Sequence, residues 1–470
     1  MTDLQGVLAW YCGFVLIFFF AINSYYLVLT VAGFCRTLRV FNEVRRPDQR
    51  RLLRSPLTPP VSVLAPAFNE DANVVENVRS VLMLDYPLFE VILVNDGSTD
   101  STLGRLIDAF DLRRSARSFE HSLRCKPIRR IYESASYPNL VVVDKANGGK
   151  ADALNAGLNL SLYPIFCAID ADSILEPDAL LRLVRPFVDA PGVTIAAGGV
   201  VRVANGCDIH GGRVHAVRLP RRPLPLIQIV EYLRAFLFGR MGWSTGNSLL
   251  VISGAFGLFE KKAAVLAGGY ATDSVGEDME LVVRMHRYRR ERRQPYRIGF
   301  VPDPICWTEA PESFRVLRRQ RTRWQRGLID TLLRHRSMIG RPRYGTVGMV
   351  SLPGFLIFEM MSPLVELSGY LLLPLLWGSG LLSPSLAGTF FVLTILYMVL
   401  VSALAILLED LAFRRYPSVR DLGSLLLAAV LENFGFRQLT VWWRVRAFVE
   451  YLRGDLSWGA MERRGMVRTA

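Results

Sequence analysis

Hydrophobic residues along the chain follow two patterns, with long uncharged runs near both ends and short runs between them. Residues 7–34 carry no charged side chain, and a second apolar region covers about residues 346–450. A spanning helix needs about 20 apolar residues. The pattern predicts an N-terminal transmembrane helix at 7–34, a polar domain at 55–340, interfacial and transmembrane helices with about three spans at 346–450, and a basic tail at 451–470.

Basic residues set the expected orientation of the first helix. No Lys or Arg precedes it, whereas several arginines follow: Arg36, Arg39, Arg45, Arg46, Arg50, Arg51 and Arg54. A cleaved signal peptide has the opposite arrangement, with a positive start. Because basic residues stay on the cytoplasmic side, the polar domain is expected in the cytoplasm.

The polar domain alternates buried-strand patterns with helical spacing. The short apolar runs are 61–65, 91–94, 140–143 and 164–169, with helices expected over 72–84, from about Thr99, from about Lys150 and from Pro177. Alternating elements with continuous apolar strands predict an α/β domain whose mostly parallel sheet is covered on both faces.

Polar clusters follow these strands, where α/β sheets bind ligands. They are Asn69-Glu70, Asn95-Asp96, Asp144-Lys145 and Asp170-Ala171-Asp172. Asp170 and Asp172 point to one side of an extended chain. Paired carboxylates suit Mg²⁺ or Mn²⁺, often shared with substrate phosphates. The alternative is a solvated turn in which Asp172 caps the next segment.

Three further segments have both a structural and a functional interpretation. Residues 147–150 lack the spacing of a phosphate-binding P-loop, but a glycine pair before a helix can direct N–H groups at an anion. Glu277 and Asp278 could serve only as acids in the first turn of a helix. The basic, aromatic cluster at 320–326 could contact anionic lipid.

Composition narrows the class of protein. Hydrophobic residues make up 51% and charged residues 21% of the chain, which excludes a disordered protein and a collagen-like fibre. The six cysteines form no CxxC pair, and the five histidines show no ligand spacing. The net charge of +14 would suit nucleic acid, but many arginines lie beside the predicted spans, so no nucleic-acid partner is expected.

Taken together, the motifs resemble the membrane-embedded processive glycosyltransferases of family 2, which include hyaluronan, chitin, cellulose and poly-N-acetylglucosamine synthases. The matching segments occur in family order and are 66–70, 95–100, 145–155, 170–172, 253–257, 276–278 and Gln320-x-x-Arg323-Trp324. Gly276 replaces the threonine that usually precedes the two acids, so the local turn can differ.

The resemblance implies a GT-A-like α/β domain joined to an α-helical transmembrane region, and it implies a role for each matching residue. Asp278, with Glu277, would be catalytic, with Asp278 the general base on the acceptor hydroxyl. The residues implied to bind nucleotide are Asn69, Glu70, Asp96, Lys145, Lys150 and Asp170. Asp172, with Asp170, would hold the metal. Those implied at the acceptor and diphosphate are Gly254, Gln320, Arg323 and Trp324.

The implied activity is inverting, processive transfer from a UDP-sugar to a growing β-linked polysaccharide, dependent on Mg²⁺ or Mn²⁺. Its setting would be a bacterial-type inner membrane, with membrane lipid and accessory export subunits as further partners. One alternative enzyme adds a single sugar to a polyprenyl phosphate or glycolipid. A scaffold subunit with a decayed transferase fold would be expected to lose Asp172 or Asp278, and both are present.

Acidic residues inside the second apolar region suggest a route for the product. Glu359, Glu366 and Glu432 lie among apolar residues, and intramembrane acids normally face a bundle interior or a polar path. The spans after residue 345 are therefore expected to form a path for the growing chain. In the alternative, Glu359 lies in water on an interfacial helix and Glu432 pairs with Arg437.

Overall fold

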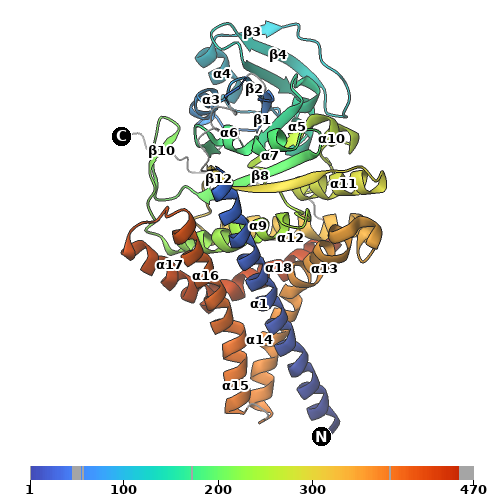
Figure 1. Cartoon of the computed structure of the whole chain (residues 1–470), viewed down its shortest axis with the longest axis vertical. Helices are drawn as coiled ribbons and strands as arrows, with labels where there is room; N and C mark the ends of the chain where they lie inside the picture. The colour runs from blue at the N-terminus through green and yellow to red at the C-terminus, as the bar shows by residue number, and fades with distance from the viewer. Residues whose placement is uncertain (1, 45–53, 56–57, 171–172, 381–382, 455–470) are drawn as a thin grey trace.

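The structure is a computed structural model that describes residues 2–44, 54–55, 58–170, 173–380 and 383–454. An α/β domain occupies one end of the molecule, and long helices extend from it to the other (Figure 1). Helices α9 (Arg240–Ser244), α12 (Phe314–Arg334) and α18 (Arg437–Leu452) lie where the two parts meet.

The described residues of the α/β domain form a ten-stranded sheet and a small two-stranded sheet. The strands are β1 Val61–Ala67, β2 Phe89–Asn95, β3 Leu112–Ser115, β4 Ile128–Ser134, β5 Leu140–Lys145, β6 Ile165–Ile169, β7 Ile174–Leu175, β8 Thr194–Val203, β9 Asp208–His210, β10 Arg213–Ala216, β11 Phe256–Glu260 and β12 Arg297–Thr308. The large sheet has the order β3-β4-β5-β2-β1-β6-β11-β8-β12-β7.

The centre of this sheet is parallel, as its apolar runs predicted. β5, β2, β1 and β6 are neighbours running in the same direction, and β5 and β6 are buried along their whole length. The expected α/β fold is confirmed. The sheet as a whole is mixed, because β3, β4, β7 and β11 pair antiparallel with their neighbours.

Helices pack around the sheet, mostly near the positions expected. They are α3 Val74–Leu82, α4 Thr102–Phe110, α5 Lys150–Leu160, α6 Ala179–Leu183, α7 Arg185–Asp189, α8 Pro223–Glu231, the π-helix η1 Tyr232–Gly239, α10 Lys261–Leu266 and α11 Glu277–Glu291, with the 3₁₀ turns η2 Arg336–Met338 and η3 Pro342–Tyr344 after α12.

Two of the expected helix starts are later in the structure. The helix expected from Pro177 begins at Ala179, because β7 pairs with β12 and Pro177 lies in the following turn. The carbonyl of Pro177 there accepts a hydrogen bond from the Asp85 N–H at 2.7 Å. The helix expected from Thr99 begins at Thr102, whose N–H donates to the Asp100 side chain at 3.0 Å.

The membrane part consists of α1 and the helices after residue 346. Their bounds are α1 Thr2–Val44, η4 Val347–Ser351, α13 Leu352–Gly354, η5 Phe355–Met360, α14 Ser362–Gly378, α15 Pro384–Phe391, η6 Val392–Leu396, α16 Tyr397–Ala412, α17 Val419–Leu431, η7 Glu432–Phe436 and α18. Among the described residues, three helical stretches are long and apolar enough to cross a membrane: Gly6–Val40, Val347–Gly378 and Pro384–Ala412. The domain limits drawn from the sequence stay a prediction.

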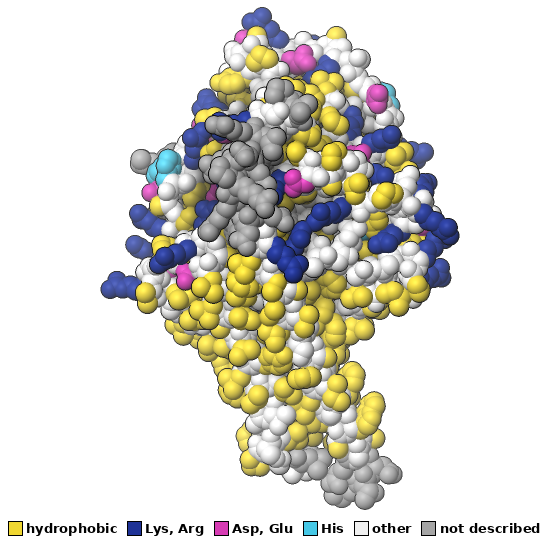
Figure 2. Space-filling view, viewed as in Figure 1, with side chains coloured by type: hydrophobic (Ala, Val, Ile, Leu, Met, Phe, Trp, Pro, Cys, Tyr) yellow, Lys and Arg dark blue, Asp and Glu magenta, His cyan; other side chains and the backbone are white. Residues whose placement is uncertain are grey.

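Surface chemistry follows the same division. Hydrophobic side chains cover the end formed by α1, α14 and α15, and Lys and Arg side chains gather beside the α/β domain (Figure 2). Helix α9 fits closely against α1, because a Cβ on Gly242 would lie 2.6 Å from the carbonyl oxygen of Leu29. The first membrane helix therefore directly supports a segment of the α/β domain.

Candidate functional site

The ends of β1 and β2 are joined by side chains of the predicted nucleotide site. Asn69 has a left-handed backbone with φ of 53°. Its side-chain oxygen accepts from the Thr99 N–H at 2.8 Å, and its own N–H donates to the Ser98 hydroxyl at 3.0 Å. The Glu70 N–H donates to the Thr102 hydroxyl at 2.9 Å. These bonds fix the loop in which both predicted residues lie.

Asp96 is the centre of a buried ionic cluster. Its carboxylate accepts from the ammonium of Lys145 at 2.5 Å and from the N–H groups of Gly148 and Gly149 at 3.0 and 2.7 Å. The glycine pair thus directs its N–H groups at an anion, which here is Asp96. Lys145 is fully buried and also pairs with Asp152 at 2.6 Å, so its direct contact with nucleotide stays a prediction.

A second cluster surrounds Lys150 at the start of α5. Its ammonium pairs with Asp170, which directly follows β6, and lies 3.8 Å from a carboxylate oxygen of Glu277. The same ammonium lies 3.4 Å from the carbonyl oxygen of Gly254. A Cβ on Gly254 would come within 2.8 Å of it. The fold thus brings together four of the predicted residues.

Burial shapes the charges of this cluster. The pKa of Glu277 is raised to about 7, above all by burial and also by the neighbouring Asp278, while Lys150 opposes the rise. Burial tends to lower the pKa of Lys150, but Asp170 and Glu277 outweigh it and the pKa is raised. Lys150 therefore stays charged, whereas Glu277 changes its charge near neutral pH.

Asp278 is oriented by two backbone groups. One of its carboxylate oxygens accepts from the Gly254 N–H at 3.2 Å and the other from the Met279 N–H at 2.8 Å. Its side chain is only partly buried. The first-turn position that could have made it merely a helix-stabilising acid also aims it at the loop of Gly254. A held, partly accessible carboxylate of this kind can accept a proton from a bound hydroxyl.

Helix α12 carries the remaining predicted residues. The Trp324 ring lies 5.7 Å from the ring of Phe236, and the guanidinium carbon of Arg321 lies 4.8 Å from the centre of the Trp324 ring. The charge of Arg323 lowers the pKa of Glu277. Arg323 of α12 is therefore close enough to the acids of α11 to act on their charge. The side-chain oxygen of Gln320 is buried without a hydrogen-bond partner among the described residues.

Of the two predicted metal ligands, the structure describes Asp170 alone. Asp172 lies outside the described residues, and within them no group of three His, Cys, Asp or Glu side chains is arranged to hold a metal ion. Asp170 and Glu277 nevertheless bring carboxylate oxygens to the single ammonium of Lys150. Carboxylate oxygens are suitable ligands for a hard divalent cation, so Asp170 stays a predicted metal ligand.

Two side chains at this site were not predicted from the sequence. Phe236 lies against Trp324, and Arg240 is buried with its guanidinium carbon 4.2 Å from the centre of the Phe236 ring. The one feature of the local sequence that could have pointed to Arg240 is its position within the otherwise apolar stretch 235–243. Its significance depends on contacts with segments far away in the chain.

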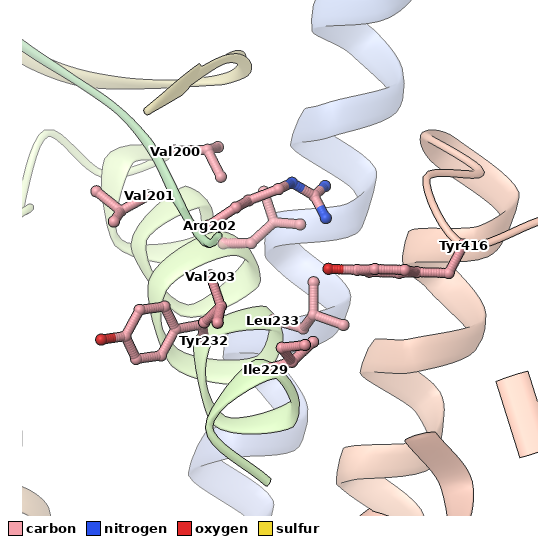
Figure 3. Close-up of a pocket in the computed structure, with 9 residues that line it drawn as sticks. Val200, Val201, Arg202, Val203, Ile229, Tyr232, Leu233 and Tyr416 are labelled. Atoms are coloured by element: carbon pink, nitrogen blue, oxygen red, sulfur yellow. The ribbon is translucent and has the colours of Figure 1, made fainter. Parts of the chain in front are cut away.

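A small cavity lies between β8, α8, η1 and Tyr416, and none of its lining residues was predicted as a site residue (Figure 3). Its volume of about 10 Å³ is close to the minimum for one water molecule and far too small for a sugar nucleotide. Beside it, Arg202 pairs with Glu409 of α16 at 3.0 Å, both nearly fully buried. This pair joins the sheet to a membrane helix.

Comparison with known proteins agrees with the predicted GT-A-like α/β domain. The family described as glycosyl transferase family 2 matches residues 62–121. Poly-beta-1,6-N-acetyl-D-glucosamine synthase of Staphylococcus epidermidis is 28% identical over 328 residues, covering 70% of this chain and 66% of that protein. The synthase of that name from Staphylococcus aureus strain COL is 28% identical over 275 residues, covering 58% and 56%. The chain thus spans less than two thirds of the length of these relatives.

Among solved structures, the mannosyltransferase PcManGT from Pyrobaculum calidifontis, in complex with GDP-Man and Mn²⁺, is 18% identical. It matches with a TM-score of 0.49 over 92% of this chain and 99% of that one. The family described as glycosyl transferase family group 2 matches residues 165–408, which is more than half of the chain. The chain therefore belongs to glycosyl transferase family group 2.

Proposed function

We propose that this protein transfers a sugar from a UDP-sugar to a growing β-linked polysaccharide at the membrane, processively and with inversion. The observation that carries the proposal is the placement of Asp278. Two backbone N–H groups hold its carboxylate. The Lys150–Asp170 pair lies beside Gly254, whose N–H donates to Asp278, and α12, which carries Trp324, packs against α18.

In the proposed reaction, each of these groups acts on a different part of the substrates. Asp278 accepts the proton of the acceptor hydroxyl, whose oxygen attacks the anomeric carbon as the bond to the diphosphate breaks. Lys150 and Arg323 stabilise the charge of the departing diphosphate. Asp170 and Asp172 would hold Mg²⁺ or Mn²⁺, which neutralises diphosphate charge when bound. A single displacement on an α-linked donor gives a β-linkage.

The similarity to poly-beta-1,6-N-acetyl-D-glucosamine synthases makes UDP-N-acetylglucosamine the first donor to consider. Asp96 would contact its uracil or ribose, in the loop that Asn69 and Glu70 complete. The Gly148 and Gly149 N–H groups and Lys145 keep Asp96 in place for this contact. We further propose an inner-membrane, multi-pass protein whose α/β domain is cytoplasmic, with lipid and export subunits as partners, since Lys and Arg gather at the boundary (Figure 2).

Buried ion pairs in the membrane part support a polar path for the product. Glu432 pairs with Arg234 of η1 at 2.7 Å, and not with Arg437 as the alternative interpretation had it. Arg437 instead pairs with Glu366 at 2.9 Å. These pairs join η1, α14, η7 and α18 into one polar seam, which a hydrated sugar chain can follow more readily than lipid can.

Further hydrogen bonds link α12, which carries Trp324, and the membrane helices. Gln325, next to Trp324, accepts from Arg444 of α18 at 2.8 Å. Glu359 accepts from the Tyr26 hydroxyl of α1 at 2.9 Å. A product leaving Trp324 would therefore meet hydrogen-bonding groups from its first contact with the membrane helices onward.

A donor screen tests the proposed transfer. The purified protein is incubated with Mn²⁺ or Mg²⁺ and, one at a time, with radiolabelled UDP-N-acetylglucosamine, UDP-glucose and UDP-glucuronate. We expect label from one of them in a product that a β-hexosaminidase or β-glucanase digests. Label only in a glycolipid or a polyprenyl-linked sugar would instead favour the single-sugar alternative, and no transfer from any donor would refute the proposal.

Vesicles test the proposed path separately. Proteoliposomes with the α/β domain outside receive the UDP-sugar outside, followed by a polymer-degrading enzyme on the same side. Product that survives until detergent is added supports export through the seam. Product that is digested at once would show that the chain never crosses the membrane.

A further inference from the structure

Arg240 is a buried cation whose charge the described part of the protein leaves without an ionic partner. Its exposure is 8%, and its Nη1 atom has no hydrogen-bond partner. The ion pairs of the described residues do not include it. Burial lowers the pKa of its guanidinium to about 10, and Asp278 opposes this fall. Placing a guanidinium donor out of water without an acceptor costs free energy, so a compensating contact is expected.

The surroundings of Arg240 are aromatic on one side and acidic on the other. Its guanidinium carbon lies 4.2 Å from the centre of the Phe236 ring, and Phe236 in turn lies against Tyr232 and Trp324, at 4.3 and 5.7 Å between ring centres. Asp278 is the carboxylate that acts on its charge. Flat aromatic faces beside hydrogen-bonding groups are suited to a sugar ring.

The segment that carries Arg240 is held rigidly. It follows the π-helix η1, and helical segments of this kind are frequent at functional sites. Gly242 and Gly33 allow the backbones of α9, η1 and α1 to approach so closely that a Cβ at either position would meet backbone atoms. The backbone that presents Arg240 is therefore held in place by its contacts with α1.

We propose that the Nη1–H group of Arg240 donates a hydrogen bond to an oxygen atom of the acceptor sugar that lies against Trp324 and Phe236. This inference rests on the proposed function. Arg240 is a positioning residue there, since it fixes the sugar ring and thereby brings the attacking hydroxyl to Asp278. The diphosphate is the weaker candidate for the contact, because Arg240 lies over the Phe236 ring, which packs against Tyr232 and Trp324, and such aromatic surroundings suit a sugar ring.

The test compares Arg240→Gln and Arg240→Lys with wild type and with Arg221→Gln, which removes an exposed arginine. Each protein receives radiolabelled UDP-N-acetylglucosamine and a short β-linked N-acetylglucosamine oligosaccharide. The KM for each substrate and the split between transfer and donor hydrolysis are measured. UDP affinity and melting temperature serve to verify the fold. Wild type must first extend the oligosaccharide, and failure there would count against the proposed function itself.

For Arg240→Gln we expect the KM for the oligosaccharide to rise by about tenfold or more, as for loss of a hydrogen bond from a charged group. The KM for the donor should stay within about twofold, and a larger share of the donor should be hydrolysed by water. Arg240→Lys should recover part of the acceptor affinity, and Arg221→Gln should match wild type. A rise in the KM for the donor alone, or unchanged values for both substrates in a folded variant, would overturn the inference.

Discussion

Gly276 and Gly327 touch at the point where α11 meets α12. A Cβ added to either glycine would lie 2.8 Å from the Cα of the other, a distance at which one backbone has to shift. This contact brings the first turn of α11, with Glu277 and Asp278, next to the helix that carries Trp324. A side chain at 276, such as the threonine that the family resemblance implies, needs space that this helix crossing does not leave.

The contact predicts that Gly276→Ala is destabilising although the change is small. We expect a loss of about 1–3 kcal/mol in unfolding free energy, typical of overpacking, together with a loss of transfer activity as α11 and α12 separate. Gly104→Ala is the matched control, because a Cβ there meets nothing within 4 Å. Thermal unfolding in detergent compares the two, and equal stability would contradict the predicted clash.

Asp278→Asn tests the proposed base. The amide keeps the shape of the side chain but cannot take the proton, so we expect transfer to fall by about 100-fold to 10,000-fold. UDP affinity, measured by calorimetry, should be unchanged because the groups around Asp96 are untouched. Asp108→Asn, at an exposed position of α4, is the control. Parallel losses of UDP affinity and transfer would make Asp278 a structural residue.

Removal of divalent cations tests the predicted metal pair. EDTA should abolish transfer, and added Mn²⁺ or Mg²⁺ should restore it. Asp172→Asn should also abolish transfer while the protein still inserts into the membrane and folds. Full turnover in EDTA would remove the basis for assigning Asp170 and Asp172 to a metal.

The raised pKa of Glu277 predicts that the stability of the folded protein depends on pH. Its pKa is raised from 4.5 to about 7, chiefly by burial, so between these values the folded protein holds a proton that the unfolded chain has released. Stability therefore falls as the pH rises from about 4.5 to 7. Between about pH 5 and pH 8, the melting temperature of wild type should fall further than that of Glu277→Gln. Equal falls would mean that Glu277 does not titrate in this range.

Local patterns were sufficient to predict the centre of the sheet. The apolar runs at β1, β2, β5 and β6 and the polar residues after them led directly to Asp96 and Asp170. β8, β11 and β12 were not predicted, although β8 is buried throughout. β8 pairs antiparallel with β11 and parallel with β12. These pairings join segments far apart in the sequence, so no regular strand–helix alternation marks them.

Side-chain partners across the fold were the other part that sequence could not supply. Sequence spacing allows Glu432 to pair with Arg437, five residues away, but Glu432 pairs with Arg234 because η1 packs beside the membrane helices. Local spacing likewise does not mark Arg240, since Asp278, which acts on its charge, and Trp324, which packs against Phe236, lie on distant segments. Local spacing identifies groups that can react, and long-range contacts decide which of them meet.

The size of the product early in the reaction tests the central claim most directly. The purified protein is given radiolabelled UDP-sugar, and products are separated by gel filtration when only a small part of the donor has been used. Processive transfer predicts label in long polymer while most of the donor remains. Label confined to a lipid-extractable product with one sugar, at any stage of the reaction, would contradict polymer synthesis by this protein.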